Sequence, residues 1–256
     1  MGTAIVTGAS AGLGIEFAKL FVQDGHQVVL VARRKEQLEA VANSLKAIFP
    51  NSKAYVIGMD LGSPGAGQRL FERTQALGLK IDFLVNNAGF GESGDFSSMS
   101  LSRQLQMIDL NVRTLVELTH LYLPSMRANK FGKILNVGST AGFQPGPFMA
   151  TYFATKAFVN SFSEALQEEL SGTGVTCTVL APGATATEFQ SVAHLDKALL
   201  FKSGVASSAP VVKAGYKGMM KGQTLVVPGF RNKAMIQLLR ISPRAVVLKL
   251  VSRLNR

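Results

Sequence analysis

The sequence predicts an α/β fold in which a doubly wound parallel sheet of about seven strands has helices on both faces. Three observations lead to this prediction. Strand-like and helix-like segments alternate along the chain, a glycine-rich loop directly follows the first strand, and polar residues follow later strands. Such sheets bind ligands in the crevice beyond the carboxyl ends of their strands, near the point where the strand order reverses. Functional residues are therefore expected just after the strands.

The elements follow one another in the order that parallel strands joined by helical crossovers require. The first strand is a short apolar segment at the start of the chain, and a helical stretch separates most later strands. The predicted strands are Thr3–Thr7, Gln27–Ala32, Ala54–Met59, Phe83–Asn86, Lys133–Val137, Thr176–Ala181 and Thr224–Val227. The predicted helices lie at about Leu13–Asp24, Lys35–Phe49, Ala66–Leu77, Leu101–Leu123, Tyr152–Leu170 and Ala209–Lys221.

A C-terminal tail follows the last strand. Residues 232–254 interleave apolar side chains with arginine and lysine and are broken at Ser242-Pro243. Proline is favoured at the start of a helix, so Pro243 is expected to begin the second of two amphipathic helices. The predicted organisation is one domain over residues 1–230 and a basic amphipathic extension over residues 231–256. This extension can pack on the domain, on a partner subunit or on an anionic membrane surface, and the sequence leaves the three open.

The composition is that of a globular enzyme. The chain has 256 residues, of which 47% are hydrophobic and 17% charged, and it holds no apolar run of the roughly 18 residues that a spanning helix needs. The first residues run directly into a strand, so no signal peptide is expected. Cys177 is the single cysteine, which excludes an internal disulfide and suits a cytoplasmic location.

The net charge of +11 is concentrated in the tail. Seven basic residues and no acidic residue lie in 231–256, which leaves +4 for residues 1–230. The tail lacks interleaved aromatic residues, so nucleic-acid binding is not expected. The three histidines, His26, His120 and His194, have no metal-ligand spacing, so no metal site is expected.

The loop after the first strand has the composition of a phosphate-binding turn. It reads Gly8-Ala9-Ser10-Ala11-Gly12-Leu13-Gly14, with the spacing G-x-x-x-G-x-G. Small residues let backbone N–H groups and a helix N-terminus approach a pyrophosphate. A simple tight turn is the alternative, but the position at the first strand-to-helix connection favours a dinucleotide site.

Two arginines follow the second strand. In NAD-binding sheets a carboxylate at this place holds the ribose hydroxyls, whereas this chain has Ala32 followed by Arg33 and Arg34. Guanidinium groups suit a 2′-phosphate and hence NADPH. The alternative is that both are solvated charges at the start of a helix, where cations are disfavoured unless an anion is present.

The later strands also end in polar residues. Asp60-Leu61 follows the third strand, where the carboxylate could accept a hydrogen bond from an adenine amino group. Asn86-Asn87-Ala88-Gly89 follows the fourth and offers side-chain amides and a close backbone. Asn111 lies in the long helical stretch, and a buried asparagine there must be bonded to backbone or water. A purely structural bridge is the alternative function for Asn111.

Tyr152 and Lys156 are four residues apart, and Ser139 lies thirteen residues before the tyrosine. One helical turn would place the phenol and the ammonium on the same face. A neighbouring cation favours the phenolate, so the pKa of Tyr152 is expected to fall below its reference of roughly 10. The pair then predicts a proton donor and the group that tunes it.

In their order and spacing these residues resemble the short-chain dehydrogenase/reductase (SDR) family, and the resemblance runs from Thr3 to about Val227. It implies a Rossmann-like fold and an NADPH-preferring oxidoreductase that interconverts a carbonyl and an alcohol. One departure concerns the cofactor, because many NADPH-preferring members carry Arg or Lys where this chain has Ala11. The matching segments are Thr7-Gly8-x-x-x-Gly12-x-Gly14, Asp60-Leu61, Asn86-Asn87-Ala88-Gly89, Asn111, Ser139, Tyr152-x-x-x-Lys156, and Pro182-Gly183 with Thr187.

The resemblance also implies a role for each site residue. Tyr152 would protonate the developing alkoxide while Ser139 donates a hydrogen bond to the same oxygen. Lys156 would bind the nicotinamide ribose hydroxyls and keep the tyrosine acidic, and Asn111 would hold the water that replaces the proton. The implied NADPH contacts are Gly8, Ser10, Ala11, Gly12, Leu13, Gly14, Arg33, Arg34, Asp60, Leu61, Asn87, Ala88, Gly89, Tyr152, Lys156, Pro182, Gly183 and Thr187.

The substrate is less defined than the reaction. The largely apolar stretch after Thr187, with Phe90, Phe143, Phe148 and Met149, favours a lipophilic ketone, aldehyde or 3-oxoacyl compound, although small ketones would also fit. The resemblance implies a homodimer or homotetramer, and peripheral membrane contact through 231–256 stays open. A nucleotide-binding regulatory protein on the same fold is the alternative function, but it would not need Ser139, Tyr152 and Lys156 together.

Overall fold

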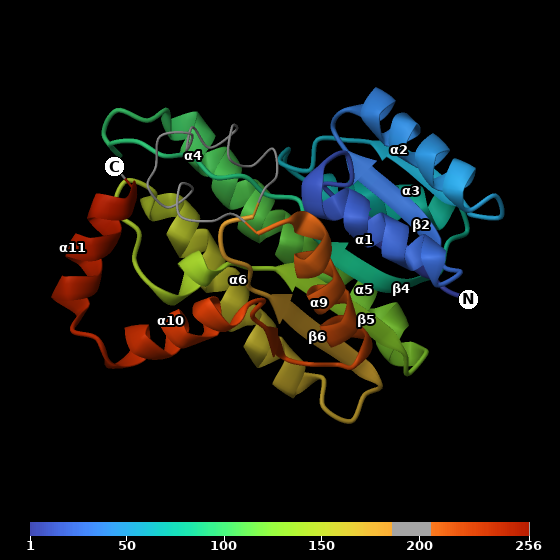
Figure 1. Cartoon of the computed structure of the whole chain (residues 1–256). Helices are drawn as coiled ribbons and strands as arrows, with labels where there is room; N and C mark the ends of the chain where they lie inside the picture. Colours follow the sequence, from blue (N-terminus) through green and yellow to red (C-terminus); the bar gives the residue numbers. More distant parts are fainter. Residues whose placement is uncertain (186–205, 256) are drawn as a thin grey trace.

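A computed structural model describes residues 1–185 and 206–255 of the chain. Its centre is a seven-stranded parallel sheet of order β3-β2-β1-β4-β5-β6-β7, which confirms the predicted fold class (Figure 1). Because β1 lies between β2 and β4, the strand order reverses at the carboxyl end of β1. The strands are β1 (Thr3–Thr7), β2 (Gln27–Ala32), β3 (Ala54–Gly58), β4 (Ile81–Asn86), β5 (Gly132–Val137), β6 (Val175–Leu180) and β7 (Leu225–Val226).

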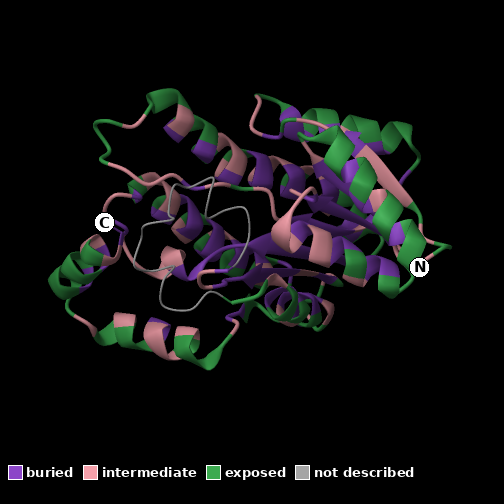
Figure 2. Ribbon diagram, turned by 45° about the horizontal axis from the view of Figure 1, so that its top comes forward, coloured by how far each residue is buried: buried purple, intermediate pink, exposed green. Residues whose placement is uncertain are grey.

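Helices cover both faces of the sheet, because successive strand residues point to opposite sides. On β1, Ala4 and Val6 belong to the core with α1, α2 and α9, whereas Ile5 belongs to the core with α3, α5 and α6. Figure 2 shows the buried strands between helices whose outer faces are exposed. These helices are α1 (Gly12–Gln23), α2 (Lys35–Ile48), α3 (Ala66–Ala76), α5 (Thr114–Ala128), α6 (Ala150–Glu169) and α9 (Ser208–Met220).

The helical stretch predicted over Leu101–Leu123 is confirmed and continues to Ala128, but it is not one regular α-helix. It consists of α4 (Leu101–Ile108), a π-helical turn η1 (Asp109–Arg113) and then α5. Polar residues at this junction bond to other elements, and Thr114 donates its hydroxyl to the Leu61 carbonyl at 2.6 Å. The apolar positions of this stretch predicted a helix and did not indicate the π turn, which is a local widening within it.

Two helices follow β7, as predicted. α10 (Phe230–Ile241) and α11 (Arg244–Asn255) lie at the opposite end of the molecule from the N-terminus (Figure 1). Ile236 of α10 packs with Ala181 and Val227, while α11 contributes to a separate cluster near α6. Within the described ranges, no helix is both long and apolar enough to cross a membrane.

Candidate active site

A cavity of about 580 Å³ opens at the carboxyl ends of strands β1 to β6. This is the edge where doubly wound sheets bind ligands. Gly14 and Asn111 are placed behind its wall, and Thr187 lies outside the described residues. The predicted site residues that line the cavity are Gly8, Ser10, Ala11, Gly12, Leu13, Arg33, Arg34, Asp60, Leu61, Asn87, Ala88, Gly89, Ser139, Tyr152, Lys156, Pro182 and Gly183.

The glycine loop has a backbone that only glycine adopts easily. Gly8 and Gly12 have φ values of +66° and +53°. A β-carbon on Gly14 would lie 2.3 Å from the Gly8 carbonyl oxygen, so α1 packs directly against the loop. The N-cap residue of α1 is Ala11, whose side chain cannot bond the first N–H groups of the helix. These N–H groups and the positive end of the helix dipole therefore suit a phosphate.

Positive charge surrounds this end of the cavity. Arg33 and Arg34 follow β2 and are both exposed at the cavity rim. The Arg34 Nη2 donates to the Ser10 hydroxyl at 3.4 Å, which brings a guanidinium beside the glycine loop. Asp60 accepts the N–H of Gly62 through Oδ1 at 3.0 Å, at the same rim. Two guanidinium groups beside a helix N-terminus fit the phosphate groups of a dinucleotide.

Thr7 and Asn87 join the carboxyl ends of β1 and β4. The Asn87 N–H donates to the Thr7 hydroxyl at 2.9 Å, and its side-chain Nδ2 donates to the Thr7 carbonyl at 2.8 Å. The Thr7 hydroxyl also accepts the N–H of Ala88 at 3.0 Å and donates to the Val85 carbonyl at 3.1 Å. Thr7 belongs to the sequence motif without a predicted site role, and its bonds hold the floor of the cavity.

Ser139 and Tyr152 face the cavity from two different elements. Ser139 follows β5, and Tyr152 lies in the first turn of α6. The Ser139 hydroxyl accepts the N–H of Ala141 at 3.0 Å and donates to the Pro182 carbonyl at 3.4 Å. Because the bond to Pro182 is long and a hydroxyl can rotate, the same hydrogen can be given to a ligand oxygen instead.

The pKa of Tyr152 moves in the direction opposite to the prediction. Burial raises this pKa to about 12, and a hydrogen bond with Ser139 only partly opposes the rise. The Lys156 ammonium lies 5.8 Å from the centre of the tyrosine ring. The loss of hydration around the phenolate outweighs a charge at that distance, so the expected lowering by Lys156 is wrong for this structure.

Lys156 lies inside the cavity wall with only 7% of its surface exposed. Its Nζ donates to the Val137 carbonyl at 2.8 Å. Burial lowers the pKa of this ammonium to about 8. An ammonium has three N–H bonds, so two donors are left for ligand hydroxyls beside Tyr152.

Asn111 is bonded to protein on both sides of its amide. Its Oδ1 accepts the N–H of Phe90 at 3.1 Å, and its Nδ2 donates to the Phe90 carbonyl at 2.9 Å and to the Thr155 hydroxyl at 3.1 Å. A β-carbon on Gly89 would lie 2.9 Å from this Oδ1, so the loop after β4 passes directly over the amide. These bonds are those of the structural bridge that the sequence left as an alternative.

Residues of α10 complete the cavity, and no sequence motif pointed to them. Arg231, Asn232 and Met235 line it from the C-terminal tail. The Asn232 Nδ2 donates to the Pro228 carbonyl at 2.7 Å. Asn232 also lies close to Gly183, because a β-carbon on Gly183 would be 2.8 Å from the Asn232 Oδ1. A contact between residues this far apart in the chain leaves no local signal in the sequence.

Only some of the apolar residues expected around the substrate line the cavity. Phe90 and Met149 line the cavity, whereas Phe143 packs with Ile236 of α10. The stretch after Thr187 lies outside the described residues up to 205. Phe153 and Met235 add apolar wall that was not predicted. In residues 1–185 and 206–255, no three His, Cys, Asp or Glu side chains gather as metal ligands would.

The sequence matches the family described as short chain dehydrogenase over residues 2–198. Two curated relatives illustrate the similarity. The ketoacyl reductase HetN of Nostoc sp. is 31% identical over 250 residues, which cover 95% of this chain and 86% of that protein. The NADP-dependent 3-hydroxy acid dehydrogenase YdfG of Escherichia coli is 37% identical over 190 residues, which cover 73% of this chain and 75% of YdfG.

Solved structures have the same fold over almost the whole chain. A short-chain dehydrogenase from Sphingobium yanoikuyae in complex with NADPH has a TM-score of 0.83 and 30% identity, with 96% of this chain and 98% of that chain covered. A 7beta-hydroxysteroid dehydrogenase has a TM-score of 0.87 and 26% identity, with coverage of 98% and 96%. The similarity to both includes the C-terminal region beyond the family match.

Proposed function

Because the chain belongs to the short chain dehydrogenase family, we propose that it is an NADP(H)-dependent oxidoreductase that interconverts a carbonyl and an alcohol. One observation carries this proposal: Ser139, Tyr152 and Lys156 line the same cavity as the glycine loop and two arginines. The relatives YdfG, which is NADP-dependent, and HetN, a ketoacyl reductase, support the same reaction class.

The cavity suits NADPH along its whole length. The first N–H groups of α1 and the small loop residues would hold the pyrophosphate, and Arg33 with Arg34 would hold the 2′-phosphate. Asn87 to Gly89 and Pro182-Gly183 line the part nearer to Tyr152. When bound, NADPH supplies the hydride that reduces a carbonyl carbon.

Tyr152 is the general acid of the reduction. Its pKa of about 12 keeps the phenol protonated at neutral pH, so it can donate its proton to the carbonyl oxygen as negative charge develops there. Such proton transfer typically contributes about 10²–10⁴-fold in rate. The Ser139 hydroxyl donates to the same oxygen and stabilises charge that appears only in the transition state.

Lys156, which lines the cavity, and Asn111, which lies behind its wall, complete the site. Lys156 keeps two donors for ribose hydroxyls, and its positive charge favours the phenolate that remains after proton donation. Asn111 holds the loop after β4 in place through its bonds to Phe90. A water held at Asn111 would pass a proton from solvent to Tyr152 after each reduction.

The substrate is a lipophilic ketone, aldehyde or 3-oxoacyl compound. Met149 and Phe153 belong to an apolar cluster with Tyr152 packed against it, and Met235 also lines the cavity, which favours a substrate with apolar groups beside its carbonyl. A panel of these three carbonyl classes, followed by the loss of NADPH absorbance, tests the proposal. Saturable NADPH binding without turnover on any of them would favour the regulatory alternative.

Removal of both guanidinium groups after β2 should change the cofactor preference. The variant Arg33→Ala/Arg34→Ala loses the charge-assisted bonds to the 2′-phosphate, each worth about 1.5–3 kcal/mol. The Kd for NADPH is expected to rise by about 100-fold, while the Kd for NADH, which has no 2′-phosphate, changes little. Isothermal titration with both cofactors measures this difference.

A matched control removes a neighbouring charge outside the cavity. Lys35 follows the two arginines but pairs with Glu39 at 3.5 Å on the outer surface of α2. The variant Lys35→Ala is expected to bind NADPH as the wild type does. Equal weakening of NADPH and NADH in the arginine variant would contradict the assigned phosphate contact.

We also propose that the protein is a homodimer or homotetramer. Exposed apolar side chains on two neighbouring helices support this assembly. Leu105 and Ile108 on α4 are 50% and 41% exposed, and Phe158 on α6 is 42% exposed. Light scattering of the wild type should give a multiple of the chain mass, and Phe158→Asp should shift it toward the monomer. A monomeric wild type would contradict this assembly.

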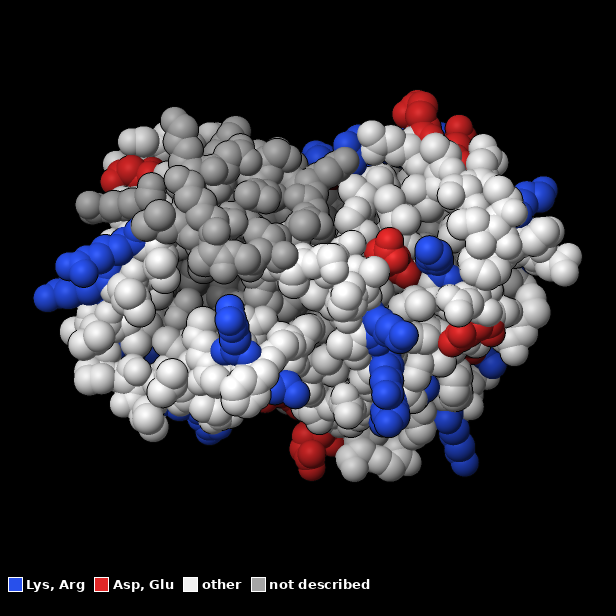
Figure 3. Space-filling view, in the orientation of Figure 1, with Lys and Arg blue, Asp and Glu red and all other residues white. Residues whose placement is uncertain are grey.

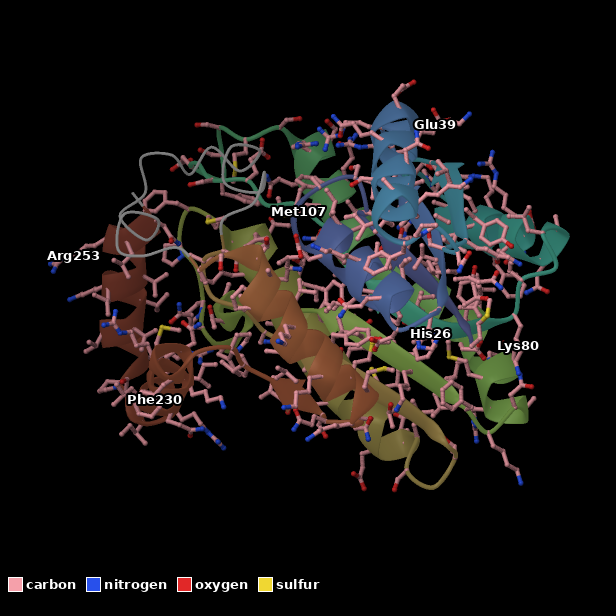
Figure 4. The ribbon with its side chains drawn as sticks, turned by 45° about the vertical axis from the view of Figure 1, so that its right-hand side comes forward. His26, Glu39, Lys80, Met107, Phe230 and Arg253 are labelled. Atoms are coloured by element: carbon pink, nitrogen blue, oxygen red, sulfur yellow. The ribbon has the colours of Figure 1, made fainter. Side chains whose placement is uncertain are left out.

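We also propose that the protein is cytoplasmic and that its extension 231–256 contacts an anionic membrane surface. It combines exposed apolar residues, such as Ile241 at 80% and Leu238 at 60%, with basic residues and no acidic one. Lysine and arginine side chains project over α11 in Figure 3, and Figure 4 places Phe230 and Arg253 at the opposite end from His26 and Lys80. This combination is typical of helices that lie on anionic lipid.

Charge reversal on the two helices tests the membrane contact. Each basic residue near an anionic surface contributes about 1 kcal/mol, so Arg240→Glu/Lys249→Glu should reduce binding to phosphatidylserine-containing vesicles by at least about tenfold. The control Lys19→Glu/Lys46→Glu makes the same charge change on α1 and α2 and should bind like the wild type. If both variants sediment equally with the vesicles, the contact does not lie on α10 and α11.

A further inference from the structure

The turn Gly146–Met149 leads directly into α6, whose first turn carries Tyr152. Phe148 in this turn has a φ of +64°, a left-handed conformation that side chains with a β-carbon rarely adopt. A β-carbon on Gly146 would lie 2.1 Å from the ring of Phe153, so the turn rests directly on that ring. Such a backbone persists only when surrounding contacts hold it.

Three hydrogen bonds hold this turn, one within it and two from other segments. The Met149 N–H donates to the Gly146 carbonyl at 3.1 Å, and the Phe148 carbonyl accepts the N–H of Gly94 at 2.9 Å. The third contact comes from the last turn of α11, where the Asn255 Nδ2 donates to the Pro147 carbonyl at 2.9 Å. Asn255 is only 6% exposed, so water competes little for this bond.

The inner face of α11 also supports the cavity wall. Val247 and Val251 are 6% and 4% exposed and form one apolar cluster with Met149 and Phe153, with Tyr152 packed against it. Met149, Phe153 and Tyr152 all line the cavity. The C-terminal helix is therefore a second layer directly behind the part of the wall that faces the proposed carbonyl.

We infer that α11 positions the substrate side of the active site, with Asn255 as the positioning residue. By fixing the Pro147 carbonyl, Asn255 sets where α6 begins, and hence where Met149 and Tyr152 face the substrate. This inference rests on the proposed carbonyl reduction and deepens it. The accommodation of a bulky carbonyl compound depends on the last turn of the chain as well as on the residues that line the cavity.

The test removes the N–H donor of the Asn255–Pro147 bond and keeps the size of the side chain. In Asn255→Asp a carboxylate takes the place of the amide and cannot donate to the Pro147 carbonyl at neutral pH. The KM for a bulky aromatic ketone is expected to rise about tenfold, with a smaller fall in kcat and an unchanged Kd for NADPH. Asn255→Gln keeps a donor and should recover part of the loss. Ser252→Ala, on the same helix, is the matched control.

Hydrogen exchange gives a readout that does not depend on turnover. In full-length Asn255→Asp, amides of residues 144–153 should exchange faster than in the wild type, whereas those of residues 3–23 should not change. The inference is overturned if exchange over 144–153 is unchanged or if exchange is faster throughout the protein. It is also overturned if exchange is faster over 144–153 while the KM is unchanged. If the wild type reduces no carbonyl at all, the proposed function fails instead, and the exchange result still decides whether Asn255 holds the turn.

Discussion

Tyr152→Phe is expected to lower kcat for carbonyl reduction by about 10²–10⁴-fold while NADPH binding is retained. The substitution removes the hydroxyl that donates the proton and keeps the ring, which packs edge to face with Phe153 at a centroid distance of 6.0 Å. The loss should appear in kcat and kcat/KM alike, because the proton is transferred only in the transition state. Steady-state kinetics with one carbonyl substrate and titration with NADPH measure the two effects.

A second tyrosine supplies the control for this substitution. Tyr55 on β3 donates its hydroxyl to Gln27 at 3.2 Å and does not line the cavity. Tyr55→Phe removes the same hydroxyl group from the protein and should leave turnover unchanged. Wild-type turnover in Tyr152→Phe would remove Tyr152 from the chemical step.

Lys156→Met should lose activity and gain stability. Burial lowers the pKa of Lys156 from 10.5 to about 8, and one pKa unit corresponds to about 1.4 kcal/mol, so the buried charge destabilises the fold by about 3 kcal/mol at neutral pH. Methionine has a similar length and no charge, but it loses the bond to the Val137 carbonyl, which is worth about 1 kcal/mol. The free energy of unfolding without cofactor is therefore expected to rise by about 2 kcal/mol at pH 7, as measured by urea titration.

The stability gain from Lys156→Met should depend on pH in a defined window. Below about pH 8 the lysine is charged in both the folded and the unfolded protein, and the full destabilisation is present. Between pH 8 and pH 10.5 the unfolded chain binds the proton that the folded protein has released, so wild-type stability rises with pH. The difference between variant and wild type should therefore shrink as the pH rises from 8 toward 9.5. A constant difference would mean that the folded ammonium is not desolvated.

The loss of activity in the same variant has a separate cause. Lys156→Met removes the positive charge that favours proton donation by the phenol, and it removes the two N–H donors proposed for the ribose hydroxyls. A site residue whose removal stabilises the protein indicates that its burial serves function rather than folding. Lys53→Met, at an exposed position, should change neither the stability nor its dependence on pH by a comparable amount.

Most of the cavity wall could be predicted from the sequence, because its residues lie immediately after strands. Gly8, Asn87 and Ser139 each follow a short apolar segment, and parallel strands bring their carboxyl ends to one edge. The order of elements was equally predictable, since it depends on local apolar patterns. The π turn at Asp109–Arg113 was not, because it contains Asn111, whose bonds go to Phe90 and Thr155 far away in the chain.

By itself, the sequence determined the sheet and the edge at which the cavity opens, and it predicted Ser139, Tyr152 and Lys156 as site residues, since these signals come from residues close together in the chain. Only the tertiary structure decided their surroundings. Desolvation raises the pKa of Tyr152, because burial depends on what other segments cover. The bond from Asn255 to Pro147 spans 108 residues, and a contact of such separation forms only when the whole chain has folded.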